Sequence, residues 1–394
     1  MRLNNLRLLN GDGLQDGLHD LWILDGKIAA IRPSESTDTH TRLPLPHEPA
    51  LDLMGALAFP GLINSHDHLD FNLFPRLANR VYNSYTEWGP DIQTNNRDSI
   101  DPILSIPRHL RTQWGIYKNL LNGFTTVVNH GEHLDGDAPP ITVFQDCYCL
   151  HSVGFEPRWK WKLNHPAKTK QPFAIHVGEG TDPDATREIG ELIRWNLLRR
   201  PLIGIHGVAM TEQQAASFRA LVWCPASNYF LLDRTAAIDR LFDKVPILFG
   251  TDSTLTSSWN AWDQIRIARS LRLVSDNDLF ATLTTNPAAA WGLNSRGTLA
   301  PGKIADIVIA RPQPGLTGMD AFFALNPQDL LLVLQQGNIR LFDPSLLEPI
   351  TQHVLTSEDF QPTRPDGKYV AGDLPGLMQE IRRYCSEVTF PVLP

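Results

Sequence analysis

The sequence FPGLINSHDHLD, from Phe59 to Asp70, decides the fold of this chain, because it is an apolar run that ends in two histidines. His66 and His68 are separated by one residue, and side chains at positions i and i+2 of a strand project from the same face. The two imidazoles can therefore bind one cation. A His-x-His pair also arises by chance on loops, so the prediction depends on the later segments of the chain.

Three later segments repeat this arrangement of an apolar run followed by a residue that can bind a metal. The runs PFAI, LIGI and PILFGT end at His176, His206 and Asp252. Short buried strands that each present one polar group at their carboxyl ends are typical of a (β/α)8 barrel, which builds its active site from several loops. The four strand ends together predict one site in such a barrel.

The composition is that of an ordinary folded protein of 394 residues, with 42% hydrophobic and 20% charged residues. A formal net charge of −8 argues against nucleic acid as a partner, and there is no apolar run of about 18 residues that would predict a membrane span. Four cysteines are too few for a disulfide framework, and the N-terminal sequence MRLNN lacks the pattern of a secretory signal. We therefore expect a cytoplasmic protein with reduced thiols.

Both ends of the chain read as β structure. Apolar runs in residues 3–33 are separated by Gly11-Asp12-Gly13 and by Asp25-Gly26, and an Asp-Gly step between apolar runs predicts a hairpin. Residues 34–48 are polar and contain proline, which predicts an exposed loop. After Gly297 a turn and a strand extend up to Ile309, and a last amphipathic helix is expected at 377–385. We predict that residues 1–57 and 298–394 build a small β-sandwich around a barrel of residues 58–297.

Within the predicted barrel, periodicity and cap residues place several helices. We expect them at residues 108–121, with Gly123 at the C-terminal cap, between 180 and 200, after His206 with the capping box Thr211-x-x-Gln214, at 261–273, and at 276–284 with Asn286-Pro287 closing the last. Residues 71–105, which include Trp88, predict a long loop that serves as a lid or binding segment.

The number of predicted strands does not settle which segments form the middle of the barrel. Six predicted strands end at His66, Asn129, His176, His206, Trp223 and Asp252, so two more must come from residues 139–171. In that interval only 148–155 reads as a strand. Either the α/β barrel is degenerate around strands 3 to 4, or residues 159–162, which read Trp-Lys-Trp-Lys, form a compact substitute strand.

His66, His68, His176 and Asp252 supply three imidazole nitrogens and one carboxylate oxygen. With one water, this set describes a site for one divalent ion with an open position, which is the catalytic arrangement of zinc. Iron(II), manganese or nickel would also accept it. Such an ion would lower the pKa of its water toward neutrality.

A proton shuttle is expected at Glu179, which comes after His176 in the sequence HVGEG. The flanking glycines let the backbone turn the carboxylate toward the site, where it would act as general acid and base. His206 would orient the water or polarise the substrate, and Asp252 would share the water proton. Each residue also has an ordinary explanation, such as a packed histidine, a helix cap or a surface carboxylate, but their joint occurrence in this order favours the site. His130, at the mouth of the strand that ends at Asn129, either touches substrate or belongs to a loop.

These residues resemble the amidohydrolase superfamily, specifically its mononuclear branch of cytosine deaminase, chlorotriazine hydrolase and related deaminases. The matching elements, in chain order, are PGLINSHDH at 60–68, His176-x-x-Glu179, His206-Gly207, CPASN at 224–228, GTDS at 250–253, NPA at 286–288 and the Gly- and Pro-containing segment 297–306. The resemblance implies a TIM barrel with a β-sandwich from both chain ends.

Residue by residue, the resemblance makes His66, His68, His176 and Asp252 the ligands of one metal ion. Glu179 becomes the proton shuttle, and His206 becomes a group behind the ligands or one that polarises the substrate. No lysine is placed on a fourth strand for carbamylation, which disfavours a two-metal site.

Four residues are candidate substrate contacts. Trp88 and His130 come from loops at the mouth of the predicted barrel, while Trp223 and Asn228 lie beside and within CPASN. Trp223 departs from the family pattern, because relatives often have histidine before Cys-Pro-x-Ser-Asn.

We predict hydrolytic deamination of a small amino-substituted heterocycle such as a purine, pyrimidine, pterin or triazine. The same site would also serve hydrolysis of an amide, a cyclic amide or a carbon–halogen bond. A metal-binding barrel without activity is a third alternative, and the intact Glu179 argues against it because binding alone needs no shuttle. The sequence leaves open whether the chain forms a homo-oligomer.

Overall fold

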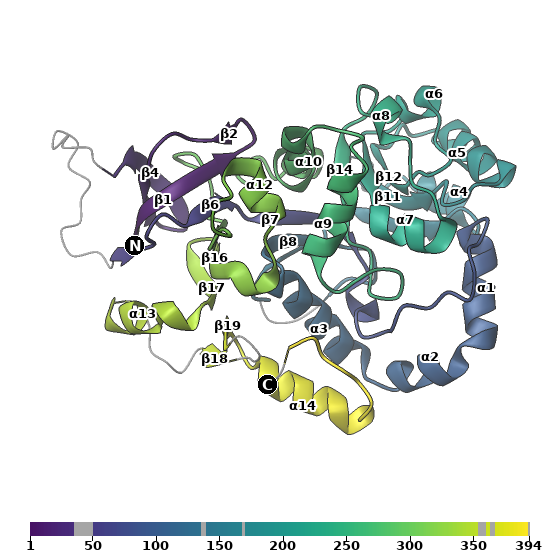
Figure 1. Ribbon diagram of the computed structural model, residues 1–394. Helices are drawn as coiled ribbons and strands as arrows, with labels where there is room; N and C mark the ends of the chain where they lie inside the picture. The colour runs from purple at the N-terminus through teal and green to yellow at the C-terminus, as the bar shows by residue number, and fades with distance from the viewer. Residues whose placement is uncertain (35–49, 135–138, 168–169, 354–359, 363–366, 393–394) are drawn as a thin grey trace.

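The computed structural model describes residues 1–34, 50–134, 139–167, 170–353, 360–362 and 367–392, and it shows a mixed α/β protein with parallel sheets. Figure 1 shows the N-terminal strands beside the C-terminal strands on one side of the molecule, and the central part of the chain on the other. Among the described residues, every helix is too short or too polar to cross a membrane.

One sheet combines strands from both chain ends, in the order β18-β19-β17-β16-β15-β6-β1-β3-β4, with β2 and β5 paired to β1. Its strands are β1 (Arg2–Asn10), β2 (Gly13–Leu14), β3 (His19–Leu24), β4 (Lys27–Pro33), β5 (Ala50–Asp52), β6 (Leu57–Pro60), β15 (Ile307–Ala310), β16 (Leu330–Gln335), β17 (Asn338–Phe342), β18 (Phe360–Pro362) and β19 (Tyr369–Ala371). The antiparallel pair of β6 and β15 joins the two ends. The expected pairing of the chain ends is therefore confirmed, while their separation as a β-sandwich domain stays a prediction.

Turns and crossings in this sheet depend on small residues. Asp25 and Gly26 connect β3 to β4 with φ of 49° and 73°, the positive values that a hairpin turn of this type requires. Gly61 separates β6 from the next strand and lies so close to Thr125 that a Cβ would clash. Residues 58–60, which were expected in the barrel, still pair in the terminal sheet. The expected loop at 34–48 lies outside the described residues, apart from residue 34.

The central part of the chain contains two parallel sheets. The first is β7 (Leu62–Asp67), β8 (Phe124–Asn129) and β9 (Thr142–Phe144), and the second is β10 (Tyr148–Ser152), β11 (Phe173–Val177), β12 (Leu202–His206), β13 (Ala220–Trp223) and β14 (Ile247–Phe249). Most of these strands are buried along their whole length, as near-continuous apolar runs predict. Asp252 N donates to His66 O at 3.1 Å, which connects the end of β14 to β7.

Among the described residues of the interval 139–171 the strands are β9 and β10, and the alternative of a substitute strand at 159–162 is wrong. That segment is helix α4 (Trp159–Leu163). Its alternation of Trp and Lys imitates a strand, but Trp159 and Leu163, four residues apart, are the buried pair, while Trp161 is 64% exposed. This is the helical period.

Most expected helices are confirmed, with shifted ends. They are α3 (Arg108–Leu121), α5 (Pro183–Trp195), α6 (Glu212–Ala215), α9 (Ala261–Ser270), α10 (Asp276–Leu283) and α14 (Leu374–Tyr384); α7 (Pro225–Leu232), α8 (Ile238–Leu241), α11 (Thr285–Ala290), α12 (Gly318–Phe323) and α13 (Leu347–His353) are additional. Gly123 lies just after α3 with φ of 85°, and the Thr211–Gln214 capping box is present. Asn286-Pro287 opens α11 instead of closing α10, because proline is tolerated in a first helical turn.

Residues 71–105 are not a plain loop, contrary to expectation. They contain α1 (Tyr85–Asn95) and α2 (Arg97–Leu104), preceded by the short helix η1 (Leu69–Phe71). Gly89, Pro90 and Pro102 lie inside these helices and obscure the pattern. The expected wall of the binding site is therefore helical.

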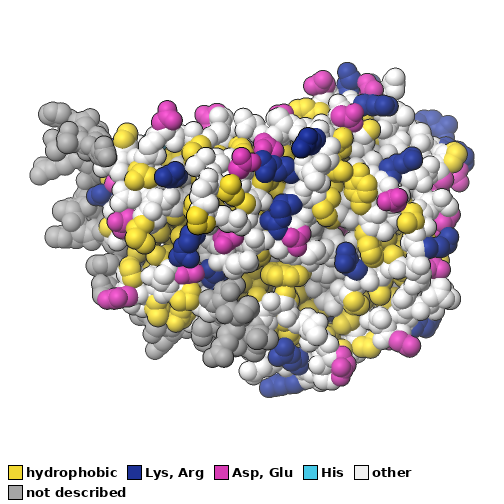
Figure 2. Space-filling view, in the orientation of Figure 1, with side chains coloured by type: hydrophobic (Ala, Val, Ile, Leu, Met, Phe, Trp, Pro, Cys, Tyr) yellow, Lys and Arg dark blue, Asp and Glu magenta, His cyan; other side chains and the backbone are white. Residues whose placement is uncertain are grey.

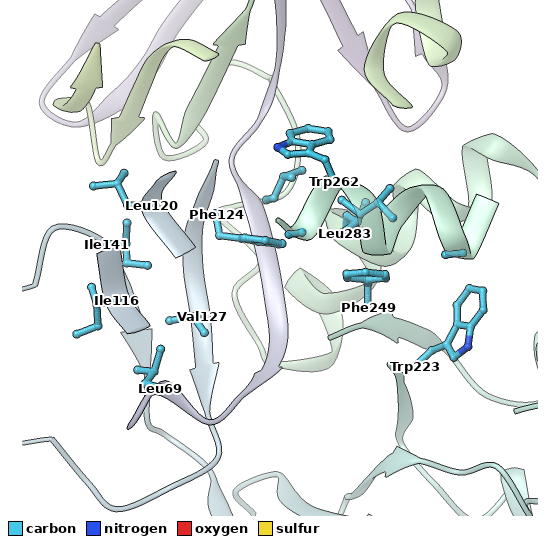
Figure 3. Packing of buried hydrophobic residues seen from close by; sticks show 14 of the residues in the cluster. Leu69, Ile116, Leu120, Phe124, Val127, Ile141, Trp223, Phe249, Trp262 and Leu283 are labelled. Carbon is cyan, nitrogen blue, oxygen red and sulfur yellow. The ribbon is translucent and has the colours of Figure 1, made fainter. Parts of the chain in front are cut away.

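Buried apolar side chains hold the parallel strands against the helices. Figure 3 shows Leu69, Ile116, Leu120, Phe124, Val127 and Ile141 around β7 and β8, and Trp223, Phe249, Trp262 and Leu283 around β14 and its neighbours. Full burial of such a side chain contributes about 1.5–3 kcal/mol. This packing fixes the strand ends that carry the histidines.

Candidate metal centre and active site

Four sequence-predicted ligands converge at the carboxyl ends of β7, β11 and β14. His66 Nε2 and His68 Nε2 each lie 3.2 Å from His176 Nε2. Asp252 Oδ1 is 3.7 Å from His66 Nε2 and 3.9 Å from His68 Nε2. Three imidazoles and a carboxylate from three different strands therefore surround one point.

Hydrogen bonds orient two of these groups. His176 Nδ1 donates to the carbonyl of His151 at 2.6 Å, which leaves Nε2 as the lone-pair nitrogen. Asp252 Oδ2 accepts from Ser227 Oγ at 2.7 Å and from Thr256 Oγ1 at 2.9 Å, so Oδ1 stays turned toward the histidines.

The charge states of these side chains suit the binding of a cation. Burial first, and then the neighbouring histidines, lower the pKa of His66 and His176 well below the ordinary value, so both imidazoles are neutral. Although burial raises it, His206, His68 and the Ser227 and Thr256 hydroxyls keep the pKa of Asp252 below its ordinary value. Neutral nitrogens that face one another at 3.2 Å beside a carboxylate fit a divalent ion.

Backbone strain marks two strand ends of the site. His206 has a φ of +71° and Asp252 a φ of +54°, a region that residues other than glycine rarely adopt. Such conformations cost about 1–3 kcal/mol each and cluster at functional sites. Gly207 and Gly178, also at positive φ, continue the turns after β12 and β11.

Glu179 faces His206 across the site, with Oε1 of Glu179 3.6 Å from Nε2 of His206. Burial first, and then the carboxylates of Asp252 and Glu188, raise the pKa of Glu179 well above its ordinary value. A carboxyl group with a raised pKa holds a proton more readily than an ordinary carboxylate, which suits a group that must accept a proton and then release it.

A chain of hydrogen bonds that ends at Nδ1 sets the tautomer of His206. Trp223 Nε1 donates to Thr235 Oγ1 at 2.7 Å, Thr235 donates to Asn228 Oδ1 at 3.3 Å, and Asn228 Nδ2 donates to His206 Nδ1 at 2.9 Å. Burial lowers the pKa of His206 to about 4, so the ring is neutral and its proton is on Nε2. His206 therefore presents a donor, not a lone pair, toward Glu179.

A cavity of about 440 Å³ opens onto these groups. His68, His176, Glu179, His206 and Asp252 form its floor. Its walls are mainly apolar and aromatic, and α1 supplies a large part of them; they include Phe71, Tyr85, Trp88, Ile92, Phe155 and Leu255, with Gln93 as a polar group. This composition is typical of a small-molecule site.

Of the predicted substrate contacts, Trp88 lies in the cavity wall, with its Nε1 bonded to Leu77 O. His130, Trp223 and Asn228 are not among the described residues that line the cavity. His130 lies behind His176, with a ring-centroid distance of 4.4 Å, and donates to Leu150 O. Trp223 and Asn228 lie behind His206, in the chain of hydrogen bonds that sets its tautomer.

Several site residues were missed in the sequence. His151 on β10 lines the cavity, Ser227 and Thr256 bond Asp252, and Gln93 lies on α1. Ser227 belongs to the CPASN motif, which was a signal for it; the others depend on contacts between distant segments.

The model of the amidohydrolase family matches residues 104–340. The 5′-deoxyadenosine deaminase of Methanothermobacter thermautotrophicus is 22% identical, over 86% of this chain and 92% of that protein. A zinc-bound adenosine deaminase from Xanthomonas campestris superposes with a TM-score of 0.74 at 16% identity, covering 98% of each chain. The zinc complex of atrazine chlorohydrolase from Arthrobacter aurescens gives a TM-score of 0.68 at 16% identity, covering 97% of this chain and 99% of that one.

Proposed function

We propose, from the premise that this chain belongs to the amidohydrolase family, that it is a metal-dependent hydrolase that deaminates a small amino-substituted heterocycle. The observation that carries this proposal is the convergence of His66, His68, His176 and Asp252 beside Glu179 at one end of a cavity. The deaminase relatives support the reaction type.

The proposed ligands are His66, His68, His176 and Asp252, with zinc as the expected ion and iron(II) as an alternative. His66, His176 and His206 also lie close enough together to form a second possible set of ligands. The proton on Nε2 of His206 argues against it, because a ligand nitrogen needs a free lone pair. A bound divalent ion supplies a water that loses its proton readily near neutral pH.

Glu179 is proposed to move the proton. Its carboxylate accepts a proton from the attacking water, and the carboxylic acid then returns it to the ring nitrogen or the amino group. The water oxygen bonds to the ring carbon, one of its two protons ends on the ring nitrogen and the other on the amino group, the carbon–nitrogen bond breaks, and ammonia leaves behind a carbonyl product. His206, held by Asn228, donates a hydrogen bond from its Nε2–H to the oxygen that attacks and keeps its proton.

The cavity walls support a flat, uncharged ring as the substrate. Phe71, Trp88 and Phe155 offer aromatic faces, and Ile92 and Leu255 add apolar contact. Gln93 presents an amide that can pair with a ring heteroatom.

We further infer that β7 to β14 form one (β/α)8 barrel. The three-stranded and five-stranded sheets contain only parallel neighbours in chain order, and the bond from Asp252 N to His66 O connects the last strand to the first. Residues 1–57 and 298–394 would form the second domain, with residues 58–60 pairing in it as well.

The test is product analysis with metal-loaded protein in water enriched in oxygen-18. A panel of amino-purines, amino-pyrimidines, pterins and amino-triazines is incubated with wild type and with E179Q. We expect ammonia release and one labelled oxygen in the product, with wild type only.

Other products would redirect the proposal. Release of halide without ammonia, or ring opening without ammonia, would assign the site to carbon–halogen or cyclic amide hydrolysis. No turnover of any substrate by protein that holds its metal would contradict an enzymatic role.

A further inference from the structure

Asp67 lies between the two histidines of His-x-His and points away from them, because neighbouring side chains on a strand alternate faces. It is fully buried, and so is Lys118 on α3, whose side chain is 1% exposed. Lys118 Nζ lies 3.2 Å from Asp67 Oδ2. A buried ion pair therefore lies directly behind the strand end that carries His66 and His68.

Three asparagines, one on β7, one directly after η1 and one on α3, also form hydrogen bonds with the Asp67 carboxylate. Asn119 Nδ2 donates to Asp67 Oδ2 at 2.7 Å, and Asn72 Nδ2 donates to Asp67 Oδ1 at 2.8 Å. Asn64 Nδ2 adds a longer contact of 3.4 Å. The carboxylate is thus held on both oxygens.

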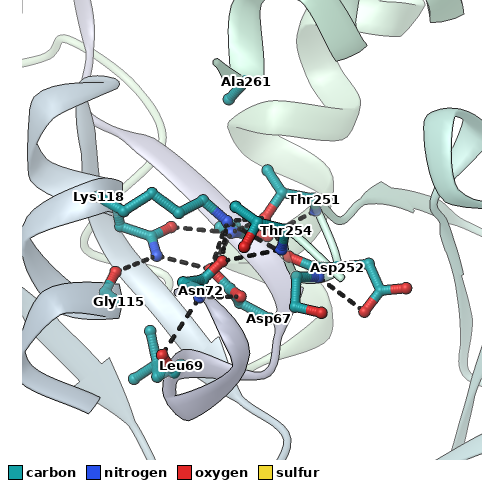
Figure 4. A network of polar contacts seen from close by, with 12 residues as sticks. Asp67, Leu69, Asn72, Gly115, Lys118, Thr251, Asp252, Thr254 and Ala261 are labelled. Carbon is teal, nitrogen blue, oxygen red and sulfur yellow. Dashed lines mark hydrogen bonds and ion pairs between the residues drawn. The ribbon is translucent and has the colours of Figure 1, made fainter. Parts of the chain in front are cut away.

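The ammonium of Lys118 also reaches the other side of the site (Figure 4). It donates to Asn72 Oδ1 at 2.8 Å, and it lies 3.4 Å from both Thr251 Oγ1 and the carbonyl oxygen of Asp252. One side chain therefore connects the carboxylate of Asp67, between His66 and His68, with the backbone of Asp252.

We propose that Lys118 is a positioning residue for the metal centre, acting through Asp67 on His66 and His68 and through the backbone on Asp252. This inference rests on the proposed function, because it takes these three residues as ligands. Lys118 does not line the cavity, so its effect on chemistry is indirect.

The physical basis is the cost of an uncompensated buried charge. If Lys118 loses its charge, the Asp67 carboxylate stays buried without its counter-ion, and the strand end must move or hydrate to relieve it. Groups behind metal ligands change metal affinity by about 10–100-fold when they are removed. A purely structural lysine would lower stability without that change.

The chain offers a matched control in Lys368, another buried lysine, which pairs with Asp343 at 2.6 Å between the terminal strands. K368M removes the same charge from an ion pair away from the site, between a buried lysine and the half-buried Asp343. D67N/K118M removes both charges of the site pair, which avoids the uncompensated carboxylate and should fold even where K118M does not.

The experiment measures the zinc dissociation constant of each metal-free full-length protein by competition with a chromogenic chelator, together with its thermal unfolding. We expect K118M to bind zinc about 10–100-fold more weakly than wild type. D67N/K118M should show a loss in the same range, because it also lacks the Lys118 contacts to Asn72, Thr251 and the backbone of Asp252. K368M should unfold at lower temperature with unchanged zinc affinity.

An unchanged zinc affinity in K118M, or in D67N/K118M where K118M fails to fold, would overturn the positioning role. If wild type itself binds no zinc, the metal-site proposal fails first and the role of Lys118 fails with it. The wild-type titration therefore separates the two failures.

Discussion

At the scale of single residues, the proposed chemistry depends on a carboxyl group at Glu179. Glutamine keeps the size of the side chain but can neither accept the water proton nor return it. We expect E179Q to retain its metal and to lose at least about a hundredfold in kcat, the range typical of a removed general acid–base group. Steady-state ammonia release with parallel metal analysis measures both. Wild-type turnover by E179Q would exclude the shuttle role.

A second carboxyl group, Glu188 on α5, connects the loop of Gly178 and Glu179 to Tyr85 in the cavity wall. It accepts from Gly178 N at 2.7 Å and from Tyr85 Oη at 3.0 Å. Burial raises the pKa of Glu188 to about 7 from an ordinary value of 4.5, against the lowering effect of these hydrogen bonds. The folded chain therefore binds this proton more tightly than the unfolded chain.

The sign of the pH effect comes from that shift. The stabilisation of the folded state by the Glu188 proton is complete below the unfolded pKa of 4.5. It is lost as the pH rises through the folded pKa of about 7. It amounts to on the order of 3 kcal/mol. Because glutamine does not titrate, E188Q should gain stability relative to wild type as the pH rises from about 5 to about 8. Urea unfolding across this range measures the difference, and parallel curves for the two proteins would contradict it.

The proposed metal ligands could be predicted because each is a ligand-type residue directly after an apolar run. Lys118 and Asp67 gave no such signal. Lys118 lies 50 residues after His68 on a helix, and only the packing of that helix against the strand end shows that its charge is buried. His151 was missed although residues 148–155 were predicted as a strand, because the mixed composition of β10 does not mark His151 as a residue that ends an apolar run.

At the scale of elements, the position of α3 against η1 controls the strand end of His66 and His68. Gly115 on α3 lies so close to the carbonyl of Leu69 that a Cβ would overlap it. G115A should therefore push the helix away from η1, which costs about 1–3 kcal/mol as overpacking. Helix propensity alone would predict a gain of up to about 1 kcal/mol.

The measurement for G115A is the urea midpoint, with zinc affinity as a second readout because Lys118 moves with the helix. A more stable protein with unchanged zinc affinity would show that the contact between α3 and η1 is unimportant.

Elements with a clear period were predicted well, as α3 and the β3–β4 hairpin show. Those with conflicting local signals were not. Gly89, Pro90 and Pro102 hid α1 and α2, and the alternating Trp and Lys of α4 imitated a strand. In each case tertiary burial decided the structure, as the buried pair of Trp159 and Leu163 shows.

At the scale of the whole molecule, the formal net charge is −8, and side chains of both signs lie at the surface (Figure 2). Figure 2 shows Lys and Arg interspersed with Asp and Glu over one face. We therefore expect substrate recognition to take place in the cavity. We expect the stability of the folded protein to depend on the metal ion bound at the cavity floor.

A bound ion that the unfolded chain does not hold stabilises the folded state by mass action. With free zinc about a thousandfold above its dissociation constant, the gain is about 4 kcal/mol. Removal of metal with a chelator should lower the unfolding temperature, and added zinc should restore it. The same scan on H66A/H68A should show no zinc effect, and a shift of equal size in that variant would place the ion elsewhere.

The most direct test of the mononuclear metal centre is the metal content of untagged protein by elemental mass spectrometry, with H66A/H68A measured beside it. We expect close to one zinc or iron per chain, lost in the double variant. Two ions per chain, or none even after reconstitution with zinc and iron(II), would contradict the mononuclear hydrolase proposed for this chain.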